Sequence, residues 1–393
     1  KNHILSAGPV EDLAFTFVKQ LDGSLKFDLY ANSNAYSQEL ICQVKSDLIS
    51  AINNIESILT KPLFVDYNRL SVFSAPSLPT NSFAHNSVLT RIYRQAKLSP
   101  AATALRIQDT KISYCELIDK ISTVAANIWN LGLDKNQTIA LVIPRSEQAI
   151  TMMMATLLLG HRFVFLDPQA PTERNLSILS DASPNLIIVH PAISAEFKGL
   201  LNAYFVIETP ALEIMKKGTD ISHFWLNEDA QLHIDAYLIY TSGSTGKPKG
   251  VVIDYAALND FTLAGELDYQ FDHSDIVLQF APFHFDACIE EVFITLSVGG
   301  QLVLRNDEML NSASEFFEQC KNWQITILDL PTAYWHELAL ATESLSLEIP
   351  KSIETIIIGG EAVQETKVAL WRKRFGTQVK LLNTYGPSEA TVV

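Results

Sequence analysis

Short apolar runs and longer amphipathic stretches alternate from about residue 88 to the end of this 393-residue chain. Apolar runs of four to five residues predict buried strands, and apolar residues recurring every three or four positions predict helices with one buried face. The expected strands are 139–142, 163–166, 186–190, 236–239, 276–280, 302–304, 325–328, 355–358 and 380–382, and the clearest helices are 112–131, 148–159 and 172–180. This order predicts an α/β fold of layered βαβ sheets flanked by helices.

The first 70 residues follow a different pattern. Residues 13–17 and 25–29 have the composition of two strands joined across Asp22-Gly23, a pair typical of a tight hairpin. Residues 38–59 carry apolar side chains at helical spacing. Residues 71–87 are rich in Ser, Pro and Asn, as in a linker. The sequence therefore predicts a small α+β unit at 1–70, a linker at 71–87 and a larger domain at 88–393.

Composition and charge exclude several classes of protein. Hydrophobic residues at 48% and charged residues at 19% predict a globular protein with a substantial core. A net charge of −15 without a cluster of Lys and Arg argues against nucleic acid as a partner. The four cysteines form no CxxC pair, and the longest apolar run, 149–160, is too short to cross a bilayer. Because no signal peptide opens the chain, we expect a cytoplasmic protein without a membrane partner.

Glycines, hydroxyls and two lysines are concentrated directly after the apolar run 236–239. Glycine lets the backbone approach a ligand closely, and consecutive N–H groups, hydroxyls and ammonium groups bind anions. The predicted phosphate contacts are Thr241, Ser242, Gly243, Ser244, Thr245, Gly246, Lys247 and Lys249. Pro248 stands where a Walker loop would have its magnesium-binding Ser or Thr, so this is a different phosphate loop. A flexible surface turn is the alternative interpretation.

The loop resembles the signature phosphate loop of adenylate-forming enzymes, and specifically of nonribosomal peptide synthetase adenylation domains. Segments 112–117, 160–168, 359–361 and 383–389 resemble further motifs of that family in the same order. The resemblance implies that 88–393 is an incomplete N-terminal core of an adenylation domain. Residues 1–70 resemble the C-terminal end of a condensation domain. Phe165 and Tyr255 depart from the family, which usually has proline and histidine at these positions.

The resemblance also assigns roles in nucleotide binding. Tyr385 is expected to stack on adenine, and Glu389 to hold Mg²⁺ that bridges the phosphates, as an aromatic face and a hard carboxylate would. Lys247, Lys249 and Glu389 are the expected catalytic residues. The remaining expected nucleotide contacts are Gly359, Gly360, Glu361, Asn383, Thr384, Gly386 and Ser388. The implied reaction is attack of a substrate carboxylate on the α-phosphorus of ATP.

Asp286 matches the family's anchor for the substrate α-ammonium, which points to an amino acid as substrate. The other residues expected to line the pocket are Ala287, Glu290, Asp329, Ile357, Gly359, Thr384, Val392 and Val393. Glu290 lies four residues after Asp286 on one helix face, and Asp329 follows the apolar run 325–328. Burying such carboxylates unpaired costs several kcal/mol unless a cation accompanies them. We therefore expect a basic substrate, lysine or β-lysine first, then ornithine or arginine. The alternative is that both acids face solvent or pair with lysines of the protein.

The resemblance implies ATP and Mg²⁺ as cofactors, and loading of the activated amino acid onto the phosphopantetheine of a downstream carrier domain that this chain does not contain. Peptidyl carrier and condensation domains are the expected partners. The family's C-terminal subdomain would follow Val393, so we expect the chain alone to be poorly active. Two alternatives are a non-catalytic nucleotide-binding or structural fragment, mildly favoured by Phe165 and Tyr255, and an acyl-CoA ligase-like enzyme, which would have no use for Asp286.

Overall fold

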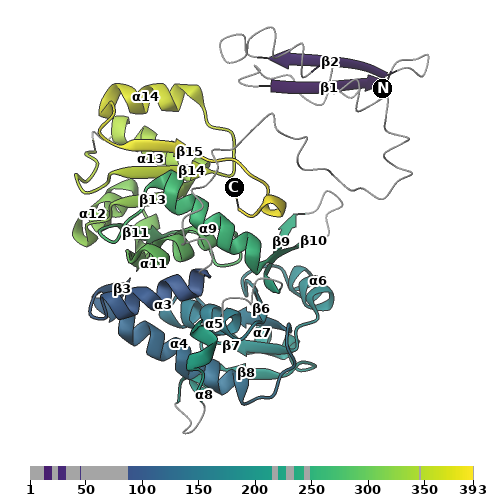
Figure 1. Cartoon of the computed structure of the whole chain (residues 1–393). Coiled ribbons are helices and arrows are strands. Elements are labelled where there is room, and N and C mark those ends of the chain that lie inside the picture. Colours follow the sequence, from purple (N-terminus) through teal and green to yellow (C-terminus); the bar gives the residue numbers. More distant parts are fainter. Residues whose placement is uncertain are drawn as a thin grey trace. The chain divides into compact units, whose positions relative to one another are not determined.

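A computed structural model describes residues 13–19, 25–31, 45, 87–214, 220–226, 234–242, 248–344 and 347–392, with only the backbone for 13–19, 25–31 and 242 (Figure 1). The chain divides into two compact units, Lys1–Thr80 and Asn81–Val393. In the smaller unit, β1 (Leu13–Lys19) pairs with β2 (Leu25–Ala31) in antiparallel register, which confirms the predicted strand pair. The predicted helix 38–59 and linker 71–87 lie outside the described residues, apart from Lys45 and Ser87.

Two sheets form the framework of the larger unit. The six-stranded sheet has the order β10 (Pro248–Asp254), β9 (Asp235–Ser242), β6 (Arg162–Phe165), β5 (Thr138–Val142), β7 (Leu186–Val189) and β8 (Val206–Glu208). The seven-stranded sheet has the order β15 (Lys380–Asn383), β14 (Thr355–Gly359), β13 (Ile327–Pro331), β11 (Ile276–Gln279), β12 (Gln301–Leu304), β3 (Thr103–Ile107) and β4 (Thr110–Ser113). Neighbouring strands are parallel except β10–β9 and β3–β4. The predicted α/β class is confirmed.

Helices cover the faces of both sheets (Figure 1). The α-helices are α3 (Val88–Leu98), α4 (Tyr114–Trp129), α5 (Glu147–Leu158), α6 (Thr172–Ala182), α7 (Ala195–Leu200), α8 (Thr209–Glu213), α9 (Tyr255–Tyr269), α10 (Ala287–Ile289), α11 (Thr295–Val298), α12 (Ala313–Trp323), α13 (Thr332–Ser344) and α14 (Glu365–Phe375). A π-helix, η3 (Glu290–Ile294), joins α10 to α11, and short 3₁₀ turns are η2 (Ser222–Leu226), η4 (Glu308–Leu310) and η5 (Ser388–Ala390).

Successive side chains of each strand point to opposite faces of its sheet, and the buried apolar side chains form three separate hydrophobic clusters. In β14, Ile356 and Ile358 pack with the helices α12–α14, whereas Ile357 joins the large central core. Ile327 of β13 also faces the central core, and side chains two residues apart share one face of a strand. Asp329, two residues after Ile327, therefore lies on the inner face beside Ile357, its register partner.

Several predicted boundaries differ from those of the structure, and one of these differences affects the site. The strand expected at 325–328 runs from Ile327 to Pro331, because Ile325 donates its N–H back to Cys320 O at the end of α12. Asp329 thus lies inside the strand rather than after it. Ile112 belongs to β4, and α4 begins at Tyr114, where Ser113 and Glu116 form a capping box.

Candidate active site

The segment that carries Asp286 and Glu290 follows the carboxyl end of β11. Asp286 is the N-terminal cap of α10, and Glu290 opens the π-helix η3. β11, β13, β14 and β15 are parallel neighbours, so their carboxyl ends meet at one edge of the sheet. Ligand sites of open parallel sheets lie at this edge. The residues expected to line the amino-acid pocket come from these strands and from the segments that follow them.

Glu290 and Asp329 come together beneath that edge. Glu290 is 3% exposed, and the side chains of Asp329 and Tyr269 both contact its carboxylate. Glu290 Oε1 and Asp329 Oδ2 are buried and have no hydrogen-bond partner among the described residues. Burial raises the pKa of Glu290 to about 7, and burial and the neighbouring carboxylate raise the pKa of Asp329 well above its ordinary value. Exposure to solvent, one of the two alternatives for these acids, is therefore ruled out for these oxygen atoms.

Asp286 is less deeply buried than Glu290 and contacts η5. Ser388 Oγ, in η5, donates a hydrogen bond to Asp286 Oδ2 across 102 positions of sequence. Asp286 also acts on Glu290, because its charge contributes to the raised pKa of that carboxyl group. The three acids expected in the pocket are thus electrostatically linked through Glu290, and Asp286 is more exposed than Glu290.

Gly359 and Thr384 form a tight part of the same edge. A Cβ atom at Gly359 would lie 2.7 Å from Thr384 Oγ1, so a larger residue fits here only if the Thr384 side chain moves. Thr332 Oγ1 donates to Gly359 O over 3.0 Å, and the Thr384 N–H donates to Ile358 O over 2.8 Å. Val392 is buried in the central core with Ile357, whereas Ala287 packs at its margin. Val393 lies outside the described residues.

The predicted phosphate loop connects two paired strands. β9 ends at Ser242 and β10 begins at Pro248, with Thr241 opposite Lys249. Gly243, Ser244, Thr245, Gly246 and Lys247 lie outside the described residues, as does the side chain of Ser242. Lys249 Nζ lies 2.7 Å from Glu389 Oε1, and both side chains are exposed. The hydrogen bond from Lys249 holds the pKa of Glu389 below its ordinary value, so Glu389 is ionised.

The residues expected to hold the nucleotide lie at the surface. Tyr385 is 93% exposed, which leaves its aromatic face available for stacking. Asn383 and Glu361 are exposed, Gly386 is partly exposed, and Gly360 adopts φ +84°. Glu389 would hold Mg²⁺. One exposed, ionised carboxylate fits that ion, because magnesium in nucleotide sites takes one or two carboxylates and completes its shell with phosphate oxygens and water.

Sequence reasoning missed two residues of the site. Glu291, next to Glu290, accepts hydrogen bonds from Phe280 N at 2.8 Å, Ala281 N at 2.9 Å and Gln279 Nε2 at 2.7 Å. It ties the pocket segment to the end of β11. Tyr269, the last residue of α9, contacts Glu290, and burial raises the pKa of its hydroxyl. The sequence analysis singled out Glu290 by its spacing from Asp286, but it gave no reason to expect a structural role for the adjacent Glu291 or a contact from Tyr269.

The two departures from the family pattern are packing residues. Phe165 is buried and stacks on Phe283 with ring centroids 5.1 Å apart. Tyr255 is fully buried at the start of α9. Neither residue lies among the charged groups described above, so these departures give no support to a non-catalytic fragment.

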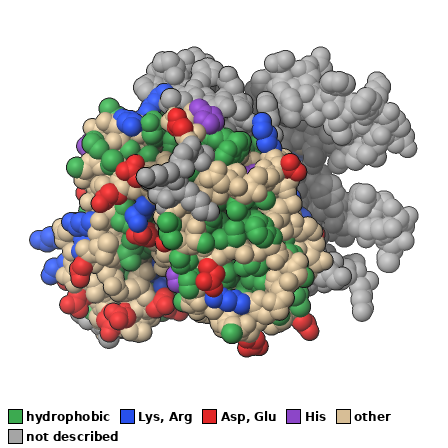
Figure 2. Space-filling model, turned by 90° about the horizontal axis from the view of Figure 1, so that it is seen from below, with side chains coloured by type: hydrophobic (Ala, Val, Ile, Leu, Met, Phe, Trp, Pro, Cys, Tyr) green, Lys and Arg blue, Asp and Glu red, His purple; other side chains and the backbone are tan. Residues whose placement is uncertain are grey.

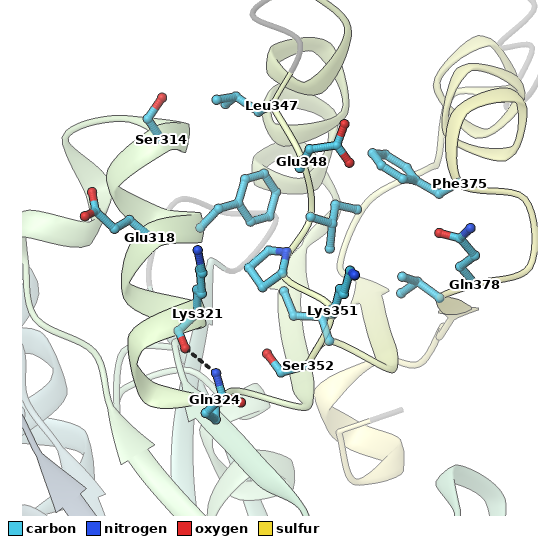
Figure 3. A pocket seen from close by; sticks show the side chains of 15 residues that line it. Ser314, Glu318, Lys321, Gln324, Leu347, Glu348, Lys351, Ser352, Phe375 and Gln378 are labelled. Atoms are coloured by element: carbon cyan, nitrogen blue, oxygen red, sulfur yellow. Dashed lines mark hydrogen bonds between the residues drawn. The ribbon is translucent and has the colours of Figure 1, made fainter.

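One cavity lies away from these residues. It has a volume of about 920 Å³ and is bounded by α12, residues 347–353 and the end of α14 (Figure 3). Lys321 and Lys351 line it together with Glu318 and Glu348. Because it adjoins the amino ends of β13 and β14, at the edge opposite Asp286, it does not contribute to the candidate site.

Charged side chains of both signs appear on one face of the molecule (Figure 2). On the face in Figure 2, Lys and Arg side chains are interspersed with Asp and Glu around a hydrophobic area. Within the described ranges, no helix has both the length and the apolar character needed to span a membrane.

Comparison with known proteins identifies the family. The family model described as "AMP-binding enzyme" matches residues 92–393. This chain belongs to the AMP-binding enzyme family. The isonitrile lipopeptide synthase of Streptomyces coeruleorubidus is 35% identical over 397 residues, covering 100% of this chain and 26% of that protein. The dimodular nonribosomal peptide synthase of Bacillus subtilis is 28% identical over 402 residues, covering 99% of this chain and 16% of that protein.

This AMP-binding chain therefore spans about a quarter or less of the length of these two curated relatives. A solved structure, the Klebsiella oxytoca NpsA N-terminal subdomain in complex with 3-hydroxybenzoyl-AMSN, has the same fold. Its TM-score is 0.65 at 21% identity, over 78% of this chain and 74% of that chain. The resemblance to adenylation domains is confirmed at the level of family and fold, and the condensation-domain remnant stays a prediction.

Proposed function

We propose that this chain is the N-terminal core of a nonribosomal peptide synthetase adenylation domain, an ATP-dependent, AMP-forming ligase that activates a basic amino acid. Lysine or β-lysine is the first choice, then ornithine or arginine. One observation carries the substrate assignment: two buried carboxylate oxygens, Glu290 Oε1 and Asp329 Oδ2, have no partner among the described residues.

The charge argument follows from burial. Two adjacent carboxyl groups removed from water cannot both ionise without a cation, and here both have raised pKa values. A ligand ammonium brings three N–H donors and a positive charge, so it would satisfy both oxygens and favour ionisation of both acids. A neutral side chain would leave the two oxygens unpaired, which penalises its binding. Asp286, which is more exposed than Glu290, would take the α-ammonium of the same substrate.

The proposed chemistry needs no side-chain nucleophile. A carboxylate oxygen of the amino acid attacks the α-phosphorus of ATP, the bond to the β-phosphate oxygen breaks, and pyrophosphate leaves. The ammonium of Lys249 and the donors of the phosphate loop would offset the negative charge that develops on the phosphates. Glu389 would hold Mg²⁺, which supplies further charge compensation there. Lys249 and Glu389 pair with each other in this structure, so both would exchange partners when nucleotide binds.

Transfer of the activated amino acid to the phosphopantetheine of a carrier domain would complete the function. The full-length relatives are peptide synthases, which supports such a partner for the polypeptide that contains this chain.

Calorimetric titration of the 393-residue chain, with ATP and magnesium present, tests the substrate. L-norleucine matches lysine in its methylene chain but lacks the distal ammonium, so the ratio of the two dissociation constants reports the charge. We expect lysine to bind at least about 30-fold tighter, the equivalent of about 2 kcal/mol. Glu196→Gln, an exposed acid on α7, is the matched control and should leave the ratio unchanged. Equal or tighter binding of norleucine, or binding of benzoate instead of any amino acid, would contradict the assignment.

A further inference from the structure

Two adjacent residues of η5 contact the two halves of the site. Ser388 Oγ donates to Asp286, the proposed anchor of the α-ammonium. Glu389 Oε1 lies 2.7 Å from Lys249 Nζ, at the base of the phosphate loop. A displacement of this single turn would therefore alter both the amino-acid side and the nucleotide side.

The turn is held in a defined conformation. The N–H groups of Ala390 and Thr391 donate to Pro387 O over 2.8 Å and to Ser388 O over 3.2 Å. Thr391 and Val392 follow with φ of 72° and 70°, a region that β-branched residues rarely adopt and that persists only where surrounding contacts enforce it. Val392 is itself buried with Ile357 in the central core. The backbone after η5 is thus fixed by packing at the wall of the pocket.

We propose that Ser388 is a positioning residue that couples binding of the amino acid to binding of the nucleotide. Its hydroxyl fixes one oxygen of Asp286 and leaves the other free for the ammonium, since a carboxylate accepts several hydrogen bonds. An ammonium bound to Asp286 orders the hydrogen bond between Asp286 and Ser388. It thereby orders η5, the turn that carries Glu389. The nucleotide then binds to a turn that is already ordered, so each ligand tightens the other by the same factor.

This inference rests on the proposed function only in taking Asp286 as the ammonium anchor. It does not depend on a basic side chain, because among the described residues no hydrogen bond or ion pair joins the distal acids Glu290 and Asp329 to η5. A neutral amino acid as substrate would overturn the charge assignment and leave the coupling measurable with that amino acid.

The experiment measures a coupling factor by calorimetry. The dissociation constant of the tightest-binding amino acid is determined without nucleotide, with AMP, and with ATP and magnesium. In the wild type we expect nucleotide to tighten amino-acid binding at least about fivefold, the lower end of ordinary coupling. Ser388→Ala should weaken amino-acid binding about tenfold without nucleotide and reduce the coupling factor to less than about twofold. Ser388→Thr keeps the hydroxyl and should restore the coupling.

Ser344→Ala is the control. Ser344 ends α13, whose 13 residues carry it roughly 20 Å from the carboxyl end of β13, and its hydroxyl donates to Leu340 O. This variant should leave both dissociation constants and their ratio unchanged. A Ser388→Ala variant that weakens both ligands while keeping the wild-type coupling factor would show a merely structural role and overturn the proposal. A wild-type coupling factor of one would do the same.

Discussion

Replacing Glu290 by glutamine should have two opposite effects, one on the free protein and one on the complex. The side chain keeps its shape and loses its charge. Glu290 is 3% exposed and contacts Asp329 and Tyr269, so the consequences of removing the charge are not screened by solvent. The free protein should become more stable at alkaline pH, while the complex with lysine should weaken.

The stability effect follows from the pKa of Glu290. Burial raises this pKa from the ordinary value of 4.5 to about 7, so between these two pH values the folded state binds more protons than the unfolded state. The free energy of unfolding therefore falls as pH rises through this window, and the loss is complete above pH 7. A rise of this size corresponds to roughly 3 kcal/mol. Glu290→Gln cannot ionise, so at pH 8 it should be more stable than the wild type by up to that amount. At pH 4.5 the two should be about equal.

The binding effect has the opposite sign. A hydrogen bond between a carboxylate and an ammonium contributes about 1.5–3 kcal/mol, so its loss should weaken lysine binding roughly 10- to 150-fold. Norleucine binding should change by no more than a few-fold. Wild-type affinity for lysine should also rise with pH from about 6 to 8, because the ligand binds the ionised form of Glu290, and Glu290→Gln should lose much of that dependence.

Urea unfolding at pH 4.5 and pH 8, together with calorimetric titration, measures both effects. Glu291→Gln is a matched control, since Glu291 is as deeply buried and burial raises its pKa to about 7, yet its oxygens accept three protein hydrogen bonds. That variant should be destabilised at both pH values. If Glu290→Gln is destabilised at pH 8 and keeps wild-type affinity for lysine, the acid pair is structural and the reasoning is refuted.

Three further substitutions test other parts of the site. Gly359→Ala places a Cβ 2.7 Å from Thr384 Oγ1 and should lower Tm by several degrees in thermal unfolding, whereas the double variant with Thr384→Ala should recover most of that loss. Lys249→Met removes an exposed ion pair and should change unfolding free energy by less than about 0.5 kcal/mol, yet weaken ATP binding about tenfold in titrations at low salt. Tyr269→Phe removes the hydroxyl that lowers the pKa of Glu290, so the rise of lysine affinity with pH should shift to higher pH; an unshifted profile would exclude that contact.

The fold class could be predicted from the sequence because apolar residues in the larger unit follow the spacing expected of buried strands and amphipathic helices closely. β5 and β14 are continuous apolar runs, as strands buried on both faces should be, and α4 has both its capping box and its apolar face in the sequence. Asp329 was also visible, since an acid next to Ile327 and Leu328 conflicts with burial on both faces. The strand boundary was wrong because the turn that ends α12 continues through Ile325, and apolar character alone does not separate a helix end from a strand start.

Contacts between side chains far apart in the sequence could not be predicted from this single sequence. The bond between Ser388 and Asp286 joins residues 102 positions apart, and Tyr269 reaches Glu290 from a separate helix. Motif resemblance assigned Ser388 to the nucleotide and Asp286 to the amino acid. It gave no reason to connect them, because hydrogen-bond geometry depends on how η5 folds back beside α10.

The adjacent glutamates 290 and 291 show why burial alone does not identify a binding residue. Both are buried and both have raised pKa values, so by composition and electrostatics they are alike. Successive residues of a helix point in different directions, and in η3 Glu291 contacts the backbone amides after β11 whereas Glu290 contacts Asp329 of β13. The protein gives Glu291 three donors, whereas Glu290 Oε1 receives none from the described residues. A buried carboxylate whose oxygens all receive donors stabilises the fold, whereas Glu290, which has Tyr269 as a donor but leaves Oε1 without one, favours a ligand that brings a cation. This difference makes Glu290 the residue to expect against a substrate.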